Sequence, residues 1–169
     1  MQQNSGSGEL EFWSPDLRHG VRIEKEAVAQ IHQHCVRASH NETGGILAGF
    51  YTANLNCAVV TNVTGPTPDS SSTRTSFVRG VKGVRQWLAK LWSSRSRRYF
   101  LGEWHFHPFA SPLPSVVDDS EMNAKAKDDQ VKCPEPVLII LGGDPKAQWQ
   151  IGVYVYCRDR GRIILEARQ

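Results

Sequence analysis

Apolar residues recur along this chain with two different spacings, and the spacing predicts which segments form helices and which form strands. Intervals of three and four residues indicate helices over 23–39 and 81–92, and a polar helix is expected over 116–127. Alternating or continuous apolar runs indicate strands, which are expected over 46–51, 57–64, 99–107, 136–141, 149–157 and 163–165. The run 136–141 is apolar throughout, as in a strand at the centre of a sheet.

The order of these elements predicts the fold class. A helix precedes two strands, two further helices flank the strand 99–107, and three strands follow. An α/β fold with a mostly antiparallel sheet and helices packed on it fits this order. No internal repeat or domain boundary interrupts it, so we expect a disordered polar tail over 1–10 and a single domain over 11–169. Residues 65–76 are expected to form a long loop of the kind that often carries function.

The composition is that of a protein that folds around one core without assistance. Of 169 residues, 40% are hydrophobic, which suffices for a core without a disulfide or a structural metal. The net charge of +3 is small and does not indicate a nucleic-acid or membrane partner. The polar first residues contain no secretory signal, and no apolar run approaches the roughly 20 residues that span a bilayer. We therefore expect a cytoplasmic protein.

The cysteines give the same indication. The chain has four and no CxxC pair: Cys35, Cys57, Cys133 and Cys157. They are predicted to be reduced, mostly buried thiols of a cytosolic protein. A secreted protein with two disulfides is the alternative.

The segment 102–122 carries the candidate chemistry. His105 and His107 lie two residues apart on an expected strand, so both imidazoles point to the same face. Asp118 follows across a proline-rich loop, and Ser115 is placed to cap the helix that holds it. Two imidazoles and a carboxylate suit Zn²⁺, and three protein ligands leave a fourth position for water, as in catalytic sites. A His-x-His pair alone also occurs among surface histidines and core donors, but the four residues together are more specific.

Three further carboxylates accompany this set. Glu103 shares the strand face of His105 and is predicted to accept a hydrogen bond from its imidazole. Asp119 is expected to favour the positive end of its helix. Glu42 precedes two glycines and an apolar strand, and is predicted to take a proton from a zinc-bound water and pass it to the leaving amine. Taken alone, Glu42 would be interpreted as a surface loop glutamate.

The spacing of these residues resembles that of the JAMM or MPN-plus metallopeptidases. The pattern is an upstream Glu, then His-x-His, seven residues, Ser, two residues and Asp, and this chain matches it at Glu42, His105, His107, Ser115 and Asp118. The resemblance covers about 20–157. It implies a JAB/MPN domain with a curved sheet, zinc held by the two histidines and Asp118, and Glu42 as general base. Ser115 would hydrogen-bond the water or the developing oxyanion.

A narrower resemblance concerns the substrate. TGPTPDSSSTRTSFVRG followed by GEWHFHP is similar to bacterial JAB peptidases encoded in anti-phage operons beside ubiquitin-transfer-like enzymes. It implies a deconjugating isopeptidase that cuts the amide after the C-terminus of a ubiquitin-like modifier or of a conjugated nucleotidyltransferase-type protein. The loop 65–76 would then help to form the substrate channel. Phe106 stands where the family often has Ser or Thr, and is expected to alter the groove beside the metal.

Two other classes of function are weighed against this one. A non-catalytic scaffold of the same fold would lack the histidines or the aspartate, and this chain has them all. A nucleic-acid-binding module would use the aromatic and basic residues between 87 and 100 to stack bases and meet phosphates. A Trp/Leu helical stripe is more typical of core, however, with Arg95, Arg97 and Arg98 at the solvated end of the helix. Nucleic acid and membrane are thus not expected as partners, and the sequence does not indicate the oligomeric state.

Overall fold

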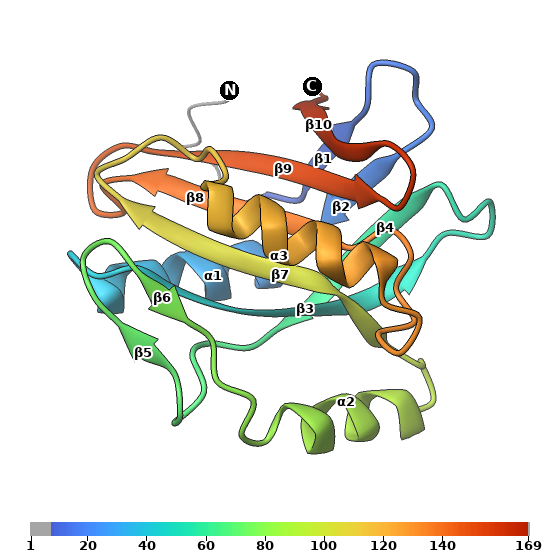
Figure 1. Ribbon diagram of the computed structural model, residues 1–169, viewed down its shortest axis with the longest axis horizontal. Helices are drawn as coiled ribbons and strands as arrows, with labels where there is room; N and C mark the ends of the chain where they lie inside the picture. Colours follow the sequence, from blue (N-terminus) through green and yellow to red (C-terminus); the bar gives the residue numbers. More distant parts are fainter. Residues whose placement is uncertain (1–7, 169) are drawn as a thin grey trace.

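Eight strands close into a barrel within residues 8–168, the part of the chain that the computed structural model describes (Figure 1). In the order in which they pair, they are β1 (Leu10–Trp13), β10 (Gly161–Ala167), β9 (Trp149–Cys157), β8 (Val137–Gly143), β7 (Tyr99–Pro108), β3 (Thr43–Tyr51), β4 (Cys57–Val63) and β2 (Gly20–Ile23). Only the β2–β4 and β7–β8 pairs are parallel. The predicted α/β class with a curved, mostly antiparallel sheet is therefore confirmed, and the curvature is strong enough to close the sheet.

The helices and a small hairpin lie around the barrel. They are α1 (Lys25–Ala38), α2 (Val84–Ser93), α3 (Val116–Lys127) and the two-stranded hairpin of β5 (Ser71–Ser72) and β6 (Phe77–Val78). Figure 1 shows α3 and α1 on opposite sides of β7, β8 and β9, and α2 apart from the barrel. No helix in this described part of the chain is both long and apolar enough to cross a membrane.

Strand β8 is buried on both faces. Val137, Ile139 and Leu141 belong to the main core, which also holds the buried face of α1. Leu138 and Ile140 point the other way and pack with the buried side chains of α3. Because a two-sided strand needs apolar residues at every position, this packing explains the continuous apolar run expected at the centre of the sheet.

Strands β1 and β2 were not indicated by the apolar pattern. Each has four residues, too few for an alternation to stand out. Ile23, expected to begin a helix, instead ends β2, and α1 begins at Lys25. Leu10, expected in the tail, pairs with Ile23 and is only 9% exposed. The expected tail therefore ends before Leu10, and its residues 1–7 lie outside the described part of the chain.

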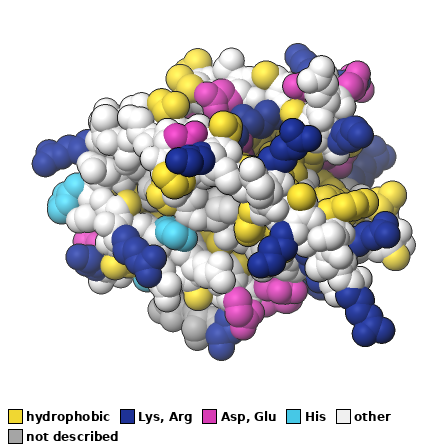
Figure 2. Space-filling view, turned by 90° about the horizontal axis from the view of Figure 1, so that it is seen from below, with side chains coloured by type: hydrophobic (Ala, Val, Ile, Leu, Met, Phe, Trp, Pro, Cys, Tyr) yellow, Lys and Arg dark blue, Asp and Glu magenta, His cyan; other side chains and the backbone are white. Residues whose placement is uncertain are grey.

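Helix α2 is not part of the core, which corrects the interpretation of its Trp/Leu stripe. None of its residues is buried, and Trp92 is 51% exposed. Arg97 lies 5.2 Å from the centre of the Trp92 ring, and Arg98 lies 4.4 Å from that of Phe50. Seen from below, the molecule shows hydrophobic side chains bordered by Lys and Arg (Figure 2). The Trp/Leu spacing predicted burial, but among the described elements only β7 packs closely against this helix.

Candidate metal centre

The end of β7 presents both histidines on the outer face of the barrel. Trp104 and Phe106 point into the main core, so the intervening His105 and His107 point outward toward α3. Phe106 is completely buried. The expectation that it alters the groove beside the metal is therefore wrong, because the alternation of the strand turns it away from that groove.

The first turn of α3 holds the aspartate. Ser115 is the N-cap, and its Oγ accepts a hydrogen bond from the backbone N–H of Asp118 at 3.1 Å. In return, the backbone N–H of Ser115 donates to Oδ2 of Asp118 at 2.7 Å. This capping box confirms the predicted cap and fixes the carboxylate before any ligand arrives. The Ser115 hydroxyl hydrogen is not used by the cap.

Asp118 meets both histidines. Its Oδ1 lies 2.7 Å from Nδ1 of His105, and its Oδ2 lies 3.6 Å from Nε2 of His107. One ligand atom from each of the three residues lies within 4.8 Å of the other two. Burial would lower the pKa of His105, but the close contact with Asp118 and the nearby charge of Glu103 raise that pKa to about 9. Without a metal the site therefore holds a proton, which a divalent cation would replace.

Glu103 lies beneath the histidines in a cluster of cations. It is 1% exposed, and its Oε1 accepts from Arg79 Nε at 3.0 Å and lies 3.5 Å from Lys125 Nζ. Its Oε2 lies 3.8 Å from Nε2 of His105, an ionic contact longer than a hydrogen bond. Burial opposes ionisation, but His105, Lys125 and Arg79 lower the pKa of Glu103 to about 2. The spacing of the sequence did not indicate Arg79 or Lys125, which keep this carboxylate charged.

Glu42 reaches the same cavity from the loop before β3. Its backbone N–H donates to the carbonyl of Thr73 at 2.8 Å, and its carbonyl accepts from the Ser72 hydroxyl. The β5–β6 hairpin thus holds the Glu42 backbone. Burial, followed by the nearby charge of Asp118, raises the pKa of the Glu42 carboxyl above its ordinary value. This shift brings the pKa of Glu42 closer to the value that suits a general base at neutral pH.

The glycines after Glu42 permit close packing beside His105. Gly44 pairs with His105 across the β3–β7 ladder. A Cβ on Gly44 would lie 2.5 Å from the Trp104 carbonyl oxygen, too close for any side chain. Gly44 is therefore required by the close approach of β3 to β7.

All five residues of the predicted site line one cavity of about 460 Å³. It also includes part of the β5–β6 hairpin and the proline-rich loop, with Arg74, Thr75, Ser76, Phe77, Pro108, Ala110, Ser111, Leu113 and Val117. The expected loop 65–76 contributes to this lining and is partly paired, because Ser71 and Ser72 pair with Val78 and Phe77. The carboxylate of Asp69 accepts from the backbone N–H groups of Val81 and Lys82, each at 3.0 Å.

The four cysteines lie elsewhere, all buried and free within the described residues. This agrees with the prediction of reduced thiols, and none of them lines the cavity at the histidines.

Comparison with known proteins gives the class first. The family of prokaryotic homologs of the JAB domain matches residues 24–152, and the chain belongs to this family.

Its relatives are more particular. The chain is 38% identical to a CD-NTase/cGAS isopeptidase of Enterobacter hormaechei subsp. hoffmannii, over 93% of this chain and 86% of that protein. It is 31% identical to a Pseudomonas aeruginosa protein of the same name, over 79% of this chain and 84% of that protein. A probable metalloprotease, y4qB, of Sinorhizobium fredii is 31% identical over 62% of this chain and 65% of that protein. The chain thus resembles JAB peptidases of the kind that its Ser/Thr-rich segment suggested.

Solved structures share the fold. A protein from Desulfitobacterium hafniense superposes with a TM-score of 0.55 at 19% identity, over 87% of this chain and 88% of that one. One from Salinibacter ruber also has a TM-score of 0.55, at 18% identity over the same shares.

Proposed function

We propose that this protein is a zinc-dependent isopeptidase that hydrolyses the amide joining the C-terminus of a conjugated protein to its target. The observation that carries the proposal is the convergence of Glu42, Ser115 and the His105–His107–Asp118 set on one cavity. Two relatives named CD-NTase/cGAS isopeptidase support the reaction class, and a relative named a probable metalloprotease supports the metal.

The donor set fits zinc. Two imidazole nitrogens and one carboxylate oxygen match the ligands of hydrolytic zinc sites, and the cavity leaves room for a water and a carbonyl group. When bound, zinc would polarise the scissile carbonyl and lower the pKa of water. Asp118 is already oriented by its capping box. The imidazole of His105 also lies in ionic contact with the carboxylate of Glu103.

The chain's own residues carry the proton and the charge. Glu42 accepts a proton from the attacking water and delivers it to the departing amine when the C–N bond breaks. The Ser115 hydroxyl donates to the developing oxyanion, since the cap uses only its oxygen lone pair. The products are a free C-terminal carboxylate and a free amine. No acyl-enzyme forms, so no cysteine takes part.

The β5–β6 hairpin is proposed to hold the extended tail of the leaving protein. It supplies Thr75, Ser76 and Phe77 to the cavity wall and fixes the Glu42 backbone. An extended tail pairing beside this hairpin would place its terminal carbonyl at the metal. The leaving protein is proposed to be of the CD-NTase/cGAS type, following the names of the relatives, with a ubiquitin-like modifier as the alternative. We place this activity in the cytoplasm, in anti-phage defence.

The test is a fusion of a CD-NTase with a short C-terminal extension, analysed by intact-mass spectrometry. Zinc-loaded protein should cut once, directly after the native C-terminus, and chelator should abolish the cut. Thiol alkylation should leave it unchanged. Cleavage that persists in chelator, or that falls at many internal positions, would overturn the proposal.

A further inference from the structure

A second group of metal-binding side chains lies at the other end of β8 and β9. His19 precedes β2, Glu135 precedes β8, and Cys157 ends β9. The strand register places Cys157 and Glu135 at the end of the β8–β9 pair opposite to His107, which is level with Gly142. This group is therefore separate from the cavity at the histidines.

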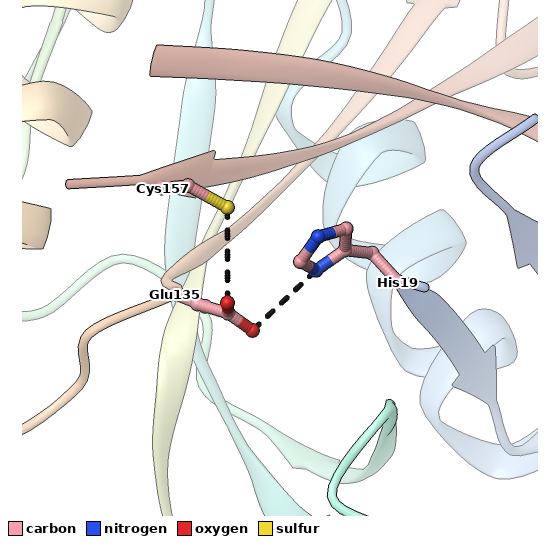
Figure 3. A group of neighbouring side chains, drawn as sticks. All are labelled: His19, Glu135 and Cys157. Atoms are coloured by element: carbon pink, nitrogen blue, oxygen red, sulfur yellow. Dashed lines mark hydrogen bonds and ion pairs between the residues drawn. The ribbon is translucent and has the colours of Figure 1, made fainter. Parts of the chain in front are cut away.

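The three side chains converge on one point. Nδ1 of His19 lies 3.4 Å from Oε2 of Glu135, and Sγ of Cys157 lies 3.8 Å from Oε1 of Glu135. Figure 3 shows the imidazole and the thiol both directed toward the carboxylate. One ligand atom from each residue lies within 4.8 Å of the other two.

These separations suit a tetrahedral ion. Zinc takes nitrogen and oxygen ligands at about 2.0–2.2 Å and sulfur at about 2.3 Å, so neighbouring ligand atoms lie about 3.3–3.7 Å apart. The two contacts, at 3.4 and 3.8 Å, join different oxygens of the Glu135 carboxylate, so rotation of this half-exposed side chain would be needed to bring one oxygen to both partners. Imidazole, thiolate and carboxylate together also favour zinc over magnesium or calcium, which prefer oxygen ligands alone.

The backbone around this group is fixed by its own hydrogen bonds. The N–H of His19 donates to Oγ of Ser14 at 3.0 Å, and the carbonyl of Glu135 accepts from the Tyr51 hydroxyl at 3.2 Å. His19 and Cys157 are each 7% exposed, whereas the Glu135 side chain is 37% exposed. Two buried ligands on rigid supports and one adjustable ligand at the surface allow an ion to enter.

Arg160 is the competing cation. Its Nη2 lies against Nε2 of His19, and its Nη1 lies 3.7 Å from Asp16. An ion on Nδ1 would keep the proton on Nε2, so Arg160 must turn away from the ring when the ion binds. Its side chain is 47% exposed and retains Asp16 as a partner, so this movement requires little free energy.

We infer that His19, Glu135 and Cys157 form a second zinc site, completed by a water as the fourth ligand, that ties the β1–β2 turn to the entrance of β8 and the end of β9. The site joins segments that are distant in the sequence, and binding to the folded chain alone raises the free energy of unfolding. It contains no glutamate placed as a general base, and its role is stabilisation. The inference stands independently of the proposed peptidase activity.

Cobalt substitution tests the site directly. Thiolate ligation of Co²⁺ gives an intense near-ultraviolet charge-transfer band, and the His105–His107–Asp118 centre has no sulfur to produce one. Cobalt-loaded wild type should show this band and bind two ions per chain. The His105→Ala/Asp118→Ala double variant should keep the band with one ion. Absence of the band from folded wild type would overturn the inference, whatever any variant does.

Matched variants locate the site. Cys157→Ser should lose the band and one ion, whereas Cys133→Ser, which removes another buried thiol that donates to the Leu101 carbonyl, should keep both. Arg160→Ala should bind zinc at this site several-fold more tightly, because the competing charge is gone. Equal bands in Cys157→Ser and wild type, or weaker binding in Arg160→Ala, would contradict the assignment.

Discussion

The two ends of the β8–β9 pair carry similar ligand sets in opposite surroundings. At one end, His105, His107 and Asp118 share a cavity with Glu42, a carboxylate whose pKa is raised by burial. At the other end, His19, Glu135 and Cys157 face Arg160, a guanidinium that cannot accept a proton. The difference teaches that metal ligands alone do not define a hydrolase. We propose that the group beside the ligands decides between catalysis and stabilisation.

The largest effect should come from removing one ligand of the His105–His107–Asp118 centre, compared with removing one ligand of the His19–Glu135–Cys157 group. Asp118→Ala should abolish peptide-bond cleavage and remove the zinc of that centre, because a ligand that touches both histidines is lost. Glu135→Ala should leave the cleavage rate within about twofold. Rates on the fusion substrate, with zinc content measured in parallel, check both. Comparable activity in the two variants would erase the distinction between the centres.

Glu42→Gln should be nearly as damaging while leaving the metal in place. Removing a general base lowers the rate by about 10²–10⁴-fold, whereas an amide in the same position still fits the cavity. Steady-state kinetics and metal analysis of the same preparation separate the two effects. If this variant cleaves at the wild-type rate, the role of base belongs to another group.

Ser115→Ala should have a smaller effect on catalysis and a separate one on stability. Loss of one oxyanion donor lowers the rate by about 10²-fold, and loss of the N-cap lowers the free energy of unfolding by about 1 kcal/mol. Ser115→Thr keeps both the hydroxyl and the cap and should recover most of each. A rate unchanged in Ser115→Ala, with the stability loss present, would reduce Ser115 to a cap.

The smallest effect concerns the pH dependence of the metal-free protein. The pKa of His105 rises from its ordinary 6.5 to about 9, so its stabilising contribution is fully present below pH 6.5 and is lost as the pH rises through 9. The Tm of the metal-free Cys157→Ser variant, which lacks the second proposed zinc site, should fall over this pH interval. Adding Asp118→Asn to that variant should make the decrease in Tm smaller. A Tm independent of pH there would show that Asp118 does not hold a proton on His105.

Local periodicity predicted much of the fold because it depends on neighbouring residues. The bounds of β9 and α3 agree with the expected 149–157 and 116–127, and Ser115 caps α3 as expected. Phe106 and α2 were misjudged because their surroundings are set by distant segments. The histidines occupy the outward face of β7, so Phe106 lies on the inward face. The apolar face of α2 has little to pack against.

Contacts between distant segments account for what the sequence did not indicate. The site residues share a recognisable spacing, so the five could be named before the structure brought them together. Arg79 and Lys125 come to Glu103 from the segment after β6 and from the last turn of α3, with no spacing that links them. His19, Glu135 and Cys157 likewise meet only because β2, β8 and β9 belong to one closed barrel.

We propose that one zinc ion, held by His105, His107 and Asp118, makes this protein a peptidase. The most direct test is a zinc titration of the metal-free Cys157→Ser variant, which lacks the second proposed zinc site. Cleavage of the fusion substrate is measured at each step. The rate should rise in proportion to bound zinc and saturate at one ion per chain. Cleavage before zinc is added, or full occupancy without cleavage of a CD-NTase or ubiquitin-like fusion, would contradict it.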